Sequence, residues 1–325
     1  MSAWLQKHWY RLSLWHLLLV PLSWLFWLLS SLRRLGYKSG LLSTYKLPVP
    51  VIVIGNISVG GTGKTPLVIW MAQKLKVAGY RPGIVSRGYA GSIDAVSPVT
   101  VDSDPGNLGD EPVLLAKRSA CPVWVGRDRV AAAKALLKAN PECNVIVSDD
   151  GLQHYRLQRD IEVAVVDGQR GFGNGRLIPA GPLREGPARL RQVDAVVYNG
   201  GHPASGAFAM HLESAAFHNL LEPAKTATAK DFSGQVIYAI AAIGNPARFF
   251  QRLAGLGLRF QQHAFPDHHA YQPADLQNIA AGTILMTEKD AVKCMAFAKE
   301  NWWYLPVSAV VEPGLAELIM NKLRN

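Results

Sequence analysis

A glycine-rich loop in the first third of the chain has the residue types and the spacing of a phosphate-binding site. It reads Ser-Val-Gly-Gly-Thr-Gly-Lys-Thr over 58–65, between an apolar β-branched run at 49–55 and a helix expected at 66–77. Glycines here let backbone N–H groups approach phosphate oxygens, and the N-terminus of the helix adds positive charge. We expect Lys64 to reach the outer phosphates of a nucleotide and Thr65 to offer its hydroxyl to Mg²⁺.

One position departs from the strict phosphate-loop pattern. Ser58 stands where the pattern has its first glycine, so a Gly-rich turn with a chance Gly-Lys-Thr is the alternative. The flanking strand and helix favour a phosphate loop, because that loop needs a strand before it and a helix after it. The residues expected to contact the nucleotide are Ser58, Val59, Gly60, Gly61, Thr62, Gly63, Lys64 and Thr65.

A pair of adjacent carboxylates supports nucleotide chemistry. Asp149 and Asp150 directly follow an apolar run at 144–148. Carboxylates at the C-terminal end of a parallel strand beside a phosphate loop are well placed for Mg²⁺. The alternative is a pair of turn residues that cap the next segment. Adjacent side chains point in different directions, so one is expected to bind the metal while the other orients it or water, and the sequence leaves open which does so.

The elements that must position these residues alternate between strands and helices. Strands are expected at 83–86, 144–148, 161–166 and 195–198, and helices at 111–119 and 127–139. This alternation predicts an α/β fold with a mostly parallel sheet covered by helices on both faces. After about residue 200 the pattern changes. An alternating ribbon at 207–213 and fresh strands at 236–241, 283–286 and 303–306 indicate a smaller second α/β unit.

Composition excludes several classes of protein. The chain has 325 residues, of which 49% are hydrophobic and 18% charged, so it is neither disordered nor of low complexity. Its three cysteines, Cys121, Cys143 and Cys294, include no close pair. A disulfide framework or a cysteine-rich zinc site is therefore not expected, and a reducing compartment fits.

The formal charge of +10 is concentrated near the N-terminus. No Asp or Glu precedes Asp94, whereas 11 Lys and Arg lie before it. Such an excess suits either a nucleic acid or an anionic lipid surface. The lipid is favoured, because no aromatic–basic nucleic-acid motif is present and the segment 12–32 contains no Lys, Arg, Asp or Glu. Five of the nine tryptophans lie in or near that segment: Trp4, Trp9, Trp15, Trp24 and Trp27.

A membrane helix is therefore expected at the N-terminus. A segment of about 21 uncharged residues is long enough to cross a bilayer, and tryptophan favours its interfaces. Whether the helix crosses or lies in the interface stays open; a core helix and a signal peptide are weaker alternatives. If it crosses, the basic residues after it, Arg33, Arg34 and Lys38, place the body of the protein in the cytoplasm.

Eight segments, in order along the chain, resemble the tetraacyldisaccharide 4′-kinase family. The resemblance runs from the N-terminal segment almost to the C-terminus. The segments are Ser-Val-Gly-Gly-Thr-Gly-Lys-Thr-Pro (58–66), Ser-Arg-Gly-Tyr (86–89), Gly-Asp-Glu-Pro (109–112), Asp-Asp-Gly-Leu-Gln-His (149–154), Pro-Ala-Gly-Pro-Leu-Arg-Glu (179–185), Gly-Asn-Pro-Ala-Arg-Phe-Phe (244–250), Phe-Pro-Asp-His-His (265–269) and Thr-Glu-Lys-Asp-Ala-Val-Lys (287–293).

The resemblance implies a lipid kinase. It would transfer the γ-phosphate of ATP, with Mg²⁺, to the 4′-hydroxyl of a tetraacylated glucosamine disaccharide 1-phosphate, giving lipid IV-A at the cytoplasmic face of the inner membrane. It also implies two α/β/α units joined by a two-stranded linker, which agrees with the change of pattern near residue 200. The expected division is a membrane helix at 1–35, a P-loop kinase unit at 36–205, the linker at 206–232 and the smaller unit at 233–325.

The resemblance also implies roles for particular residues. Asp110 would be the catalytic base, partnered by His268, with His269 as the alternative partner. From the sequence alone, Asp110 is equally a helix N-cap before Glu111 and Pro112. The Mg²⁺ ligands would be Asp150 with Asp149, Glu111 and Thr65. Candidate substrate contacts are Arg87, Arg129, His154 and Arg184, since arginine binds phosphate in bidentate fashion. Lys289 and Asp290 are structural or lie near the adenine; the sequence does not decide.

Two other functions compete with the kinase. A membrane-associated ATPase of the partition or septum-site type also carries Gly-Gly-Thr-Gly-Lys-Thr. It needs a signature lysine before the paired glycines, however, where this chain has Val59, and its membrane helix is usually C-terminal. The second competitor is a membrane-anchored binding module with an inactive phosphate loop, against which Lys64, Thr65, Asp110 and Asp150 argue. Neither a nucleic acid nor an obligate protein partner is expected.

Overall fold

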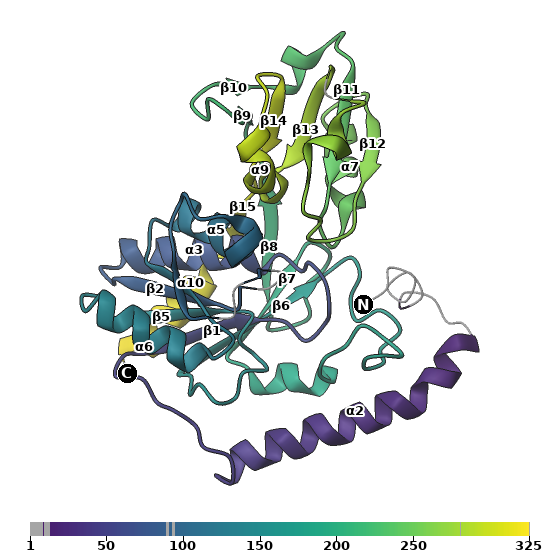
Figure 1. Ribbon diagram of the computed structural model, residues 1–325. Coiled ribbons are helices and arrows are strands. Elements are labelled where there is room, and N and C mark those ends of the chain that lie inside the picture. Colours follow the sequence, from purple (N-terminus) through teal and green to yellow (C-terminus); the bar gives the residue numbers. More distant parts are fainter. Residues whose placement is uncertain (1–8, 10–13, 89–90, 93–94, 280, 325) are drawn as a thin grey trace.

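The protein folds into two α/β units, the smaller stacked on the larger (Figure 1). This computed structural model describes residue 9 and residues 14–324 apart from 89–90, 93–94 and 280. The helices are α2 (Leu14–Lys38), α3 (Lys64–Val77), α4 (Pro105–Leu108), α5 (Asp110–Ser119), α6 (Arg129–Ala139), α7 (Pro246–Gly255), α8 (Pro273–Leu276), α9 (Glu288–Cys294) and α10 (Gly314–Arg324).

The strands form two separate sheets. The first unit contains β1 (Val51–Gly55), β2 (Pro82–Ser86), β3 (Ser97–Val99), β4 (Val123–Val125), β5 (Val145–Asp149), β6 (Ile161–Asp167), β7 (Ala195–Asn199), β8 (Phe208–Glu213) and β15 (Ser308–Val311). The second unit contains β9 (Phe217–Asn219), β10 (Thr226–Ala227), β11 (Ile237–Ala241), β12 (Gln261–Ala264), β13 (Thr283–Thr287) and β14 (Trp302–Leu305).

The larger sheet has the order β15-β8-β7-β6-β1-β5-β2-β4-β3. Its pairs are parallel except at the two edges, where β15 and β3 run antiparallel to their neighbours. Helices cover both faces, so the central strands are apolar on both sides. In β1, Ile52 and Ile54 belong to the core beneath α3 and α5, whereas Val51 and Val53 belong to the core beneath α6. The predicted doubly covered parallel sheet is confirmed.

The smaller sheet has the order β10-β9-β14-β13-β11-β12, and its four strands from β14 to the edge strand β12 are parallel. Ala239, Ala241 and Leu285 pack against Phe249 and Leu253 of α7 on one face. The opposite face packs against α8 and α9. This confirms the predicted second α/β unit, which buries its own two apolar layers and is not an appendage of the first sheet.

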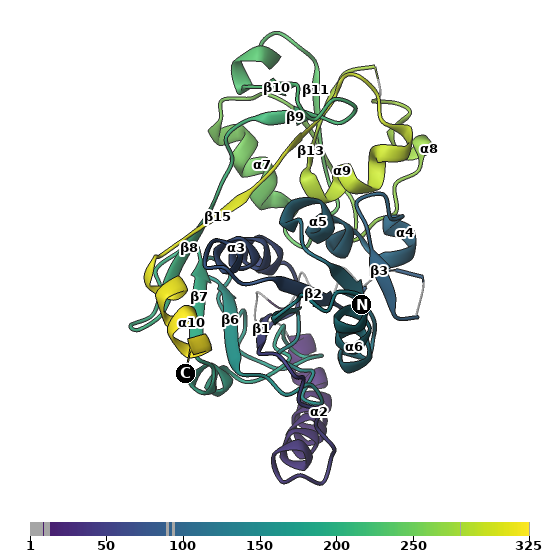
Figure 2. The ribbon, with the colours of Figure 1, turned by 90° about the vertical axis from the view of Figure 1, so that its left-hand side faces the viewer.

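The C-terminus departs from the expected division. The whole of 233–325 was expected in the second unit, but β15 pairs antiparallel with β8 in the first sheet, with Val311 opposite Met210. The helix α10 then packs against α3, with Leu315 and Ile319 fully buried in the first core. The chain thus crosses between the units twice, and β8 and β15 are the two strands that connect them (Figure 2).

The expected linker at 206–232 is likewise divided. Only β8 of that range lies in the connection, since β9 and β10 belong to the second sheet. Local periodicity could not reveal this, because a short strand shows which face it buries but not which distant strand it pairs with.

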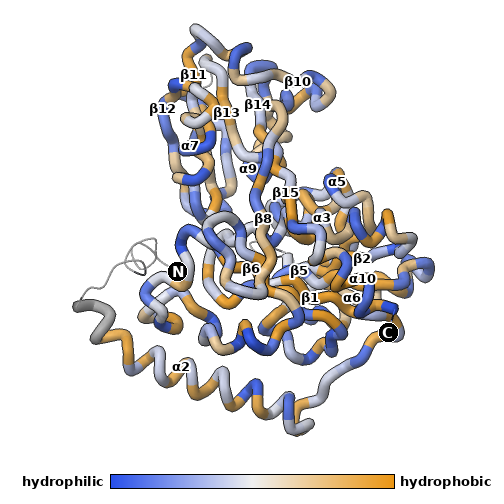
Figure 3. Tube along the Cα trace, turned by 180° about the vertical axis from the view of Figure 1, so that it is seen from behind, coloured by the Kyte–Doolittle hydropathy of each residue, from blue (hydrophilic) through white to orange (hydrophobic). Residues whose placement is uncertain are grey.

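The N-terminal helix α2 runs along the outside of the first unit (Figures 1 and 3). Its part from Leu18 to Lys38 is long and apolar enough to cross a membrane. Large apolar side chains point away from the protein: Leu18, Leu22, Trp24, Leu25, Trp27, Leu28, Leu29, Leu32 and Leu35 are all exposed. The start of the expected membrane segment and Tyr89 of one quoted segment lie outside the described residues.

Candidate active site

The phosphate loop joins β1 to α3 with its backbone held from the side. The buried Thr62 accepts a hydrogen bond from Asn56 through its hydroxyl and another from Asn199 through its carbonyl. At Gly63 the backbone has φ 94°, and a Cβ would lie 2.3 Å from the Asn199 amide nitrogen. Only glycine satisfies both constraints. Lys64 and Thr65 follow as the first residues of α3, the position required for binding phosphates at a helix N-terminus.

The structure explains why Ser58 replaces the first glycine of the pattern. Ser58 forms an isolated antiparallel bridge with Leu183, and the Val59 N–H donates to the Pro182 carbonyl at 2.7 Å. Ser58 is not among the residues with a positive φ. Because the backbone is extended at this point, a side chain is tolerated and the loop keeps its course.

Asp150 connects the carboxylate pair to the phosphate loop. Its carboxylate lies 3.5 Å from Lys64 Nζ and 2.9 Å from Arg184 Nη1. Burial alone would raise the pKa of Asp150, but Lys64 and then Arg184 outweigh burial and lower it. Its backbone is left-handed, with φ 48°, an uncommon conformation that concentrates at functional sites. Asp150 is therefore an ionised group that faces the phosphate loop.

Asp149 is the more deeply buried carboxylate. Its Oδ2 accepts a hydrogen bond from Ser86 at 3.1 Å, whereas Oδ1 is buried with no partner among the described residues. Burial, and then the nearby Glu111 and Asp150, raise the pKa of Asp149 to about 7. An unpartnered carboxylate oxygen beside the negative charges of Glu111 and Asp150 fits a divalent cation.

Mg²⁺ suits this arrangement better than a metal held by protein alone. Within the described part of the chain, no three His, Cys, Asp or Glu side chains form a ready-made metal site. Mg²⁺ usually takes one or two carboxylates together with substrate phosphates and waters. Asp149 and Asp150 at the end of β5 supply such carboxylates opposite the phosphate loop.

Asp110 and His268 meet across the two units. His268 Nδ1 lies 3.0 Å and 3.1 Å from the two carboxylate oxygens of Asp110, which begins α5. His268 follows β12 and has a left-handed backbone, with φ 61°. Its ring nitrogen therefore reaches Asp110 from a strained turn. His269, the alternative partner, instead contacts Asp275 at 2.9 Å.

Two lysines of α9 complete the surroundings of Asp110. Lys289 Nζ lies 3.9 Å from Asp110 and 2.9 Å from Glu111, and Lys293 Nζ lies 3.8 Å from Asp110. Burial would raise the pKa of Asp110, but Lys289, His268 and Lys293 together lower it to about 2. Asp110 is buried yet ionised, and its N-cap alternative is not what the structure shows, since it is the first residue inside α5.

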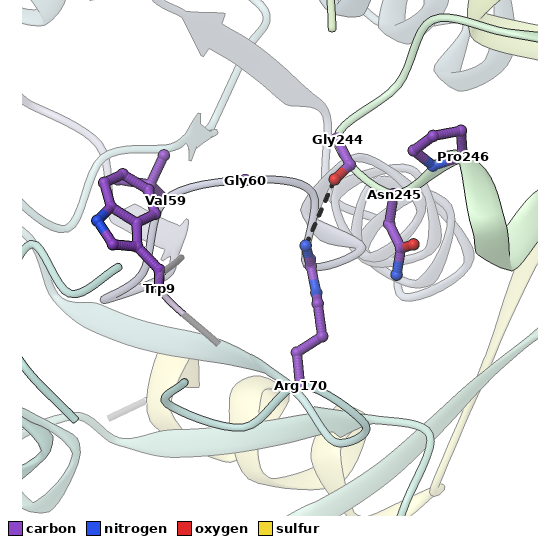
Figure 4. Close-up of a pocket in the computed structure, with 7 residues that line it drawn as sticks. All are labelled: Trp9, Val59, Gly60, Arg170, Gly244, Asn245 and Pro246. Atoms are coloured by element: carbon purple, nitrogen blue, oxygen red, sulfur yellow. Dashed lines mark hydrogen bonds between the residues drawn. The ribbon is translucent and has the colours of Figure 1, made fainter. Parts of the chain in front are cut away.

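A second contact between the units lies at the outer side of the phosphate loop (Figure 4). Arg170 pairs with Asp167 at 2.8 Å, donates to the Gly61 carbonyl, and reaches the Gly244 carbonyl at 3.4 Å. A cavity of about 250 Å³ lies here, lined by Trp9, Val59, Gly60, Arg170, Gly244, Asn245 and Pro246. Arg170 thus ties the phosphate loop to the start of α7.

The expected substrate residues lie around the end of β5 and differ in how exposed they are. Arg184 faces the cleft through Asp150, and Arg87 is exposed directly after β2. Arg129 is only 3% exposed and donates to the carbonyls of Gly126 and Asp149. Burial lowers its pKa to about 10. Arg129 therefore supports the end of β5 from inside, and a direct contact with substrate does not fit its position.

His154 lies in a buried, positively charged environment. Burial, and then Arg129, lower its pKa to about 4, and Arg33 of α2 is among the other cations that do so. Its Nε2 is buried without a partner within the described residues. His154 is thus a buried, neutral imidazole close to Arg129 and to Arg33 of the N-terminal helix.

Sequence reasoning missed four residues that join the units: Lys289, Lys293, Arg170 and Arg248. The sequence leaves the role of Lys289 open. Arg248 lies within the segment 244–250 and donates to Asn199 at 2.9 Å. The spacing of Lys289 and Lys293, four residues apart in a helix, places both on one face and was the available signal. Glu111, the partner of Lys289, lies 178 residues away in the sequence, so local patterns could not predict the contact.

The arrangement defines a class of protein. An ATPase needs only water beside its phosphate loop, whereas here the second unit brings an imidazole and two lysines to Asp110 of the first unit. A base beside a phosphate loop suits transfer of a phosphoryl group to a hydroxyl acceptor. The class is that of P-loop kinases.

Comparison with known proteins identifies the family. The family model described as tetraacyldisaccharide-1-P 4′-kinase matches residues 15–324. The tetraacyldisaccharide 4′-kinase of Methylobacillus flagellatus is 53% identical over 99% of this chain and 96% of its own length. That of Azoarcus sp. is 52% identical over 95% and 92%. The chain belongs to the tetraacyldisaccharide 4′-kinase family, which comprises ATP-dependent kinases of lipid A biosynthesis.

A solved structure agrees with this assignment. The LpxK kinase of Aquifex aeolicus, crystallised in complex with ATP, matches with a TM-score of 0.81 and 29% identity, over 95% of this chain and 100% of that one. The predictions of the family, of a kinase and of ATP as cofactor are confirmed, and the partition-type ATPase is set aside.

Proposed function

We propose that this chain transfers the γ-phosphate of ATP to the 4′-hydroxyl of a tetraacyldisaccharide 1-phosphate, with Asp110 as the base. The observation that carries the assignment of the base is the contact of 3.0 Å between Asp110 and His268 beside the phosphate loop. It brings together one residue from each unit, so the base is complete only when the units are closed.

The phosphate loop supplies positioning and positive charge. Backbone N–H groups from Gly60 to Lys64 and the N-terminus of α3 would hold the β- and γ-phosphates. Lys64, which pairs with Asp150 at 3.5 Å, would turn to the γ-phosphate when ATP binds. Asp149 and Asp150, with Thr65 and Glu111, would hold the Mg²⁺ ion. When bound, that ion neutralises charge on the transferred phosphoryl group.

Asp110 would accept the proton of the acceptor hydroxyl. With its pKa lowered to about 2, the carboxylate is ionised at every physiological pH and ready to accept. His268 holds its orientation, and Lys289 and Lys293 stabilise the charge it carries before the transfer. Because these groups come from the second unit, separation of the units would leave the base unsupported.

The acceptor would reach the site from the membrane surface. The exposed apolar face of α2 supports docking on the bilayer, and a lipid substrate that stays in the bilayer requires such docking. Tyr37 of α2 lies 6.2 Å from Tyr155 of the first unit, and Ser23 contacts that unit further along the helix. Because both parts of the helix touch the protein, α2 would lie in the interface of the inner membrane, on its cytoplasmic face, without crossing it.

Phosphate transfer in detergent micelles tests this proposal. Protein, Mg²⁺, ATP labelled at the γ-phosphate and the tetraacyldisaccharide 1-phosphate should give a labelled bis-phosphorylated lipid on thin-layer chromatography. Lys64→Ala should abolish the product. Asp110→Asn should lower kcat by about 100-fold, the usual contribution of a general base, while ATP still binds. An unchanged kcat would reduce Asp110 to a residue that starts a helix, and free phosphate without labelled lipid would refute the kinase.

A further inference from the structure

The membrane-facing helix buries a serine and exposes its large apolar residues. Ser23 is 5% exposed, whereas Leu22 and Trp24 on either side are 52% and 68% exposed. A helix of a soluble core shows the reverse. A buried hydroxyl needs hydrogen-bond partners, so the position of Ser23 points to a specific contact with the protein body.

The partners of Ser23 lie in the segment 174–184, here named the strap. The Ser23 hydroxyl donates to the Leu177 carbonyl at 2.9 Å and accepts from the Ala180 N–H at 3.0 Å. Trp9 binds the same segment, because its indole N–H donates to the Pro179 carbonyl at 2.9 Å. The Asn174 N–H also donates to the Trp9 carbonyl at 2.9 Å, so the N-terminal segment holds the strap at four of its residues.

The other edge of the strap forms backbone hydrogen bonds with the residues at the start of the phosphate loop. Val59 N–H donates to Pro182 at 2.7 Å, and Arg184 N–H donates to the Ile57 carbonyl at 2.6 Å. The Arg184 side chain then pairs with Asp150. Figure 4 shows the result at the cavity, where Trp9 from the N-terminal segment lies beside Val59 of the phosphate loop. The strap therefore contacts both α2 and the phosphate loop.

We infer that Ser23 is a positioning residue that couples the seating of α2 to the shape of the phosphate loop. Its two hydrogen bonds fix the strap, and the strap fixes the backbone at residues 57–59 and the side chain of Arg184. ATP affinity therefore depends on a residue of the membrane helix that is not part of the phosphate loop. The inference rests on the proposed function, because it needs ATP at this loop.

Measuring ATP binding without the lipid acceptor distinguishes the coupling of α2 to the phosphate loop from the anchoring of α2 in the membrane. The full chain in detergent micelles is titrated with a non-hydrolysable ATP analogue and Mg²⁺ by calorimetry. Ser23→Ala should raise the Kd about 5- to 10-fold, the effect of losing one net buried hydrogen bond. Recovery with phospholipid vesicles should not fall, since alanine is the more apolar residue. Ser23→Thr, which keeps the hydroxyl, should bind nearly as the wild type does.

The matched control is Ser30→Ala on the same helix, whose hydroxyl bonds only the Trp27 carbonyl one turn away. It should leave the Kd unchanged. A wild-type Kd for Ser23→Ala, or an equal loss in Ser30→Ala, would overturn the coupling while leaving the kinase intact. Failure of the wild type to bind the analogue would instead strike the proposed function.

A second variant covers the case in which Ser23→Ala does not fold. Trp9→Phe keeps a six-membered aromatic ring and removes the five-membered ring whose N–H donates to Pro179. The coupling predicts weaker binding of the analogue, by about 3-fold for part of one hydrogen bond. Unchanged binding in Trp9→Phe would count against the strap as the link.

Discussion

At the scale of single residues, the site contains two carboxylates whose surroundings act in opposite directions. Asp110 is buried among cations that lower its pKa to about 2, whereas Asp149 is buried beside Glu111 and Asp150, and its pKa is raised to about 7. Such divergence agrees with the two proposed roles, since a charged base needs stabilising partners and a metal ligand would gain its stabilising charge from the cation. The same burial therefore serves both residues, and the sign of the nearby charge distinguishes them.

The raised pKa of Asp149 predicts a pH-dependent stability of the metal-free protein. Asp149 ordinarily titrates at 3.8 and in the folded protein at about 7. Between these values the folded state holds a proton that the unfolded state releases, so stability falls as pH rises through this window. In EDTA, the melting temperature should fall from pH 5 to pH 8. Asp149→Asn should reduce that fall and melt higher at pH 8, by about 2–4 °C for each kcal/mol recovered.

The measurement is thermal unfolding followed by circular dichroism across the pH range. Asp102→Asn, a change at an exposed residue, serves as the control and should follow the wild type. Parallel curves for the wild type and Asp149→Asn would show that Asp149 titrates normally. Its place in the proposed Mg²⁺ site would then lack electrostatic support.

At the scale of elements, the sequence predicts elements that are encoded in short contiguous segments, but it does not predict the contacts between distant elements. The strand, phosphate loop and helix at 51–77 could be located because each is encoded within a few residues. The paired aspartates followed for the same reason. That α9 lies against α5, so that Lys289 reaches Glu111, depends on how two sheets pack. The buried position of Arg129 was equally hidden, because arginine at a cleft and arginine inside a core look alike in sequence.

The contact between α9 and α5 yields a prediction about catalysis. Lys289→Met should raise the pKa of Asp110 and loosen the closed arrangement, lowering kcat by about 10-fold, the effect of losing one charge-assisted hydrogen bond. Lys289 is argued to act through Asp110, so the acidic limb of the pH–rate profile should also move to higher pH. The limb set by Asp110 lies near pH 2 in the wild type, so steady-state phosphate transfer measured from pH 3 to 8 should show a stronger acidic fall in Lys289→Met than in the wild type.

Lys299→Met is the matched control, because Lys299 is an exposed lysine of the same unit. It should leave both kcat and the profile unchanged. A lower kcat in Lys289→Met with an unmoved acidic limb would mean that Lys289 supports the fold of α9 without tuning Asp110.

At the scale of the whole molecule, the first and the last described helices, α2 and α10, both lie on the first unit. The second unit is inserted between β8 and β15, two antiparallel strands of the first sheet. Both connections leave the same sheet edge, so movement of the second unit would bend two adjacent strands together (Figures 1 and 2). This connection suits closure over the phosphate loop, where Arg170, His268 and Lys289 meet their partners. The sequence predicted two units, but it did not predict that β15 and α10 belong to the first unit.

Because α10 packs in the first unit, a core substitution in α10 should destabilise the first unit and not the second. Leu315 of α10 is fully buried in the first core, near α3, although it lies almost at the end of the chain. Leu315→Ala should destabilise the protein by about 2–5 kcal/mol, the usual effect of such a cavity. Hydrogen–deuterium exchange should then quicken in α3 and β8 and stay slow in β11 and β13. Leu256→Ala, an exposed position after α7, is the control and should change neither region. Faster exchange confined to β11 and β13 would assign the C-terminus to the second unit, and the strand pairing of β15 with β8 would be wrong.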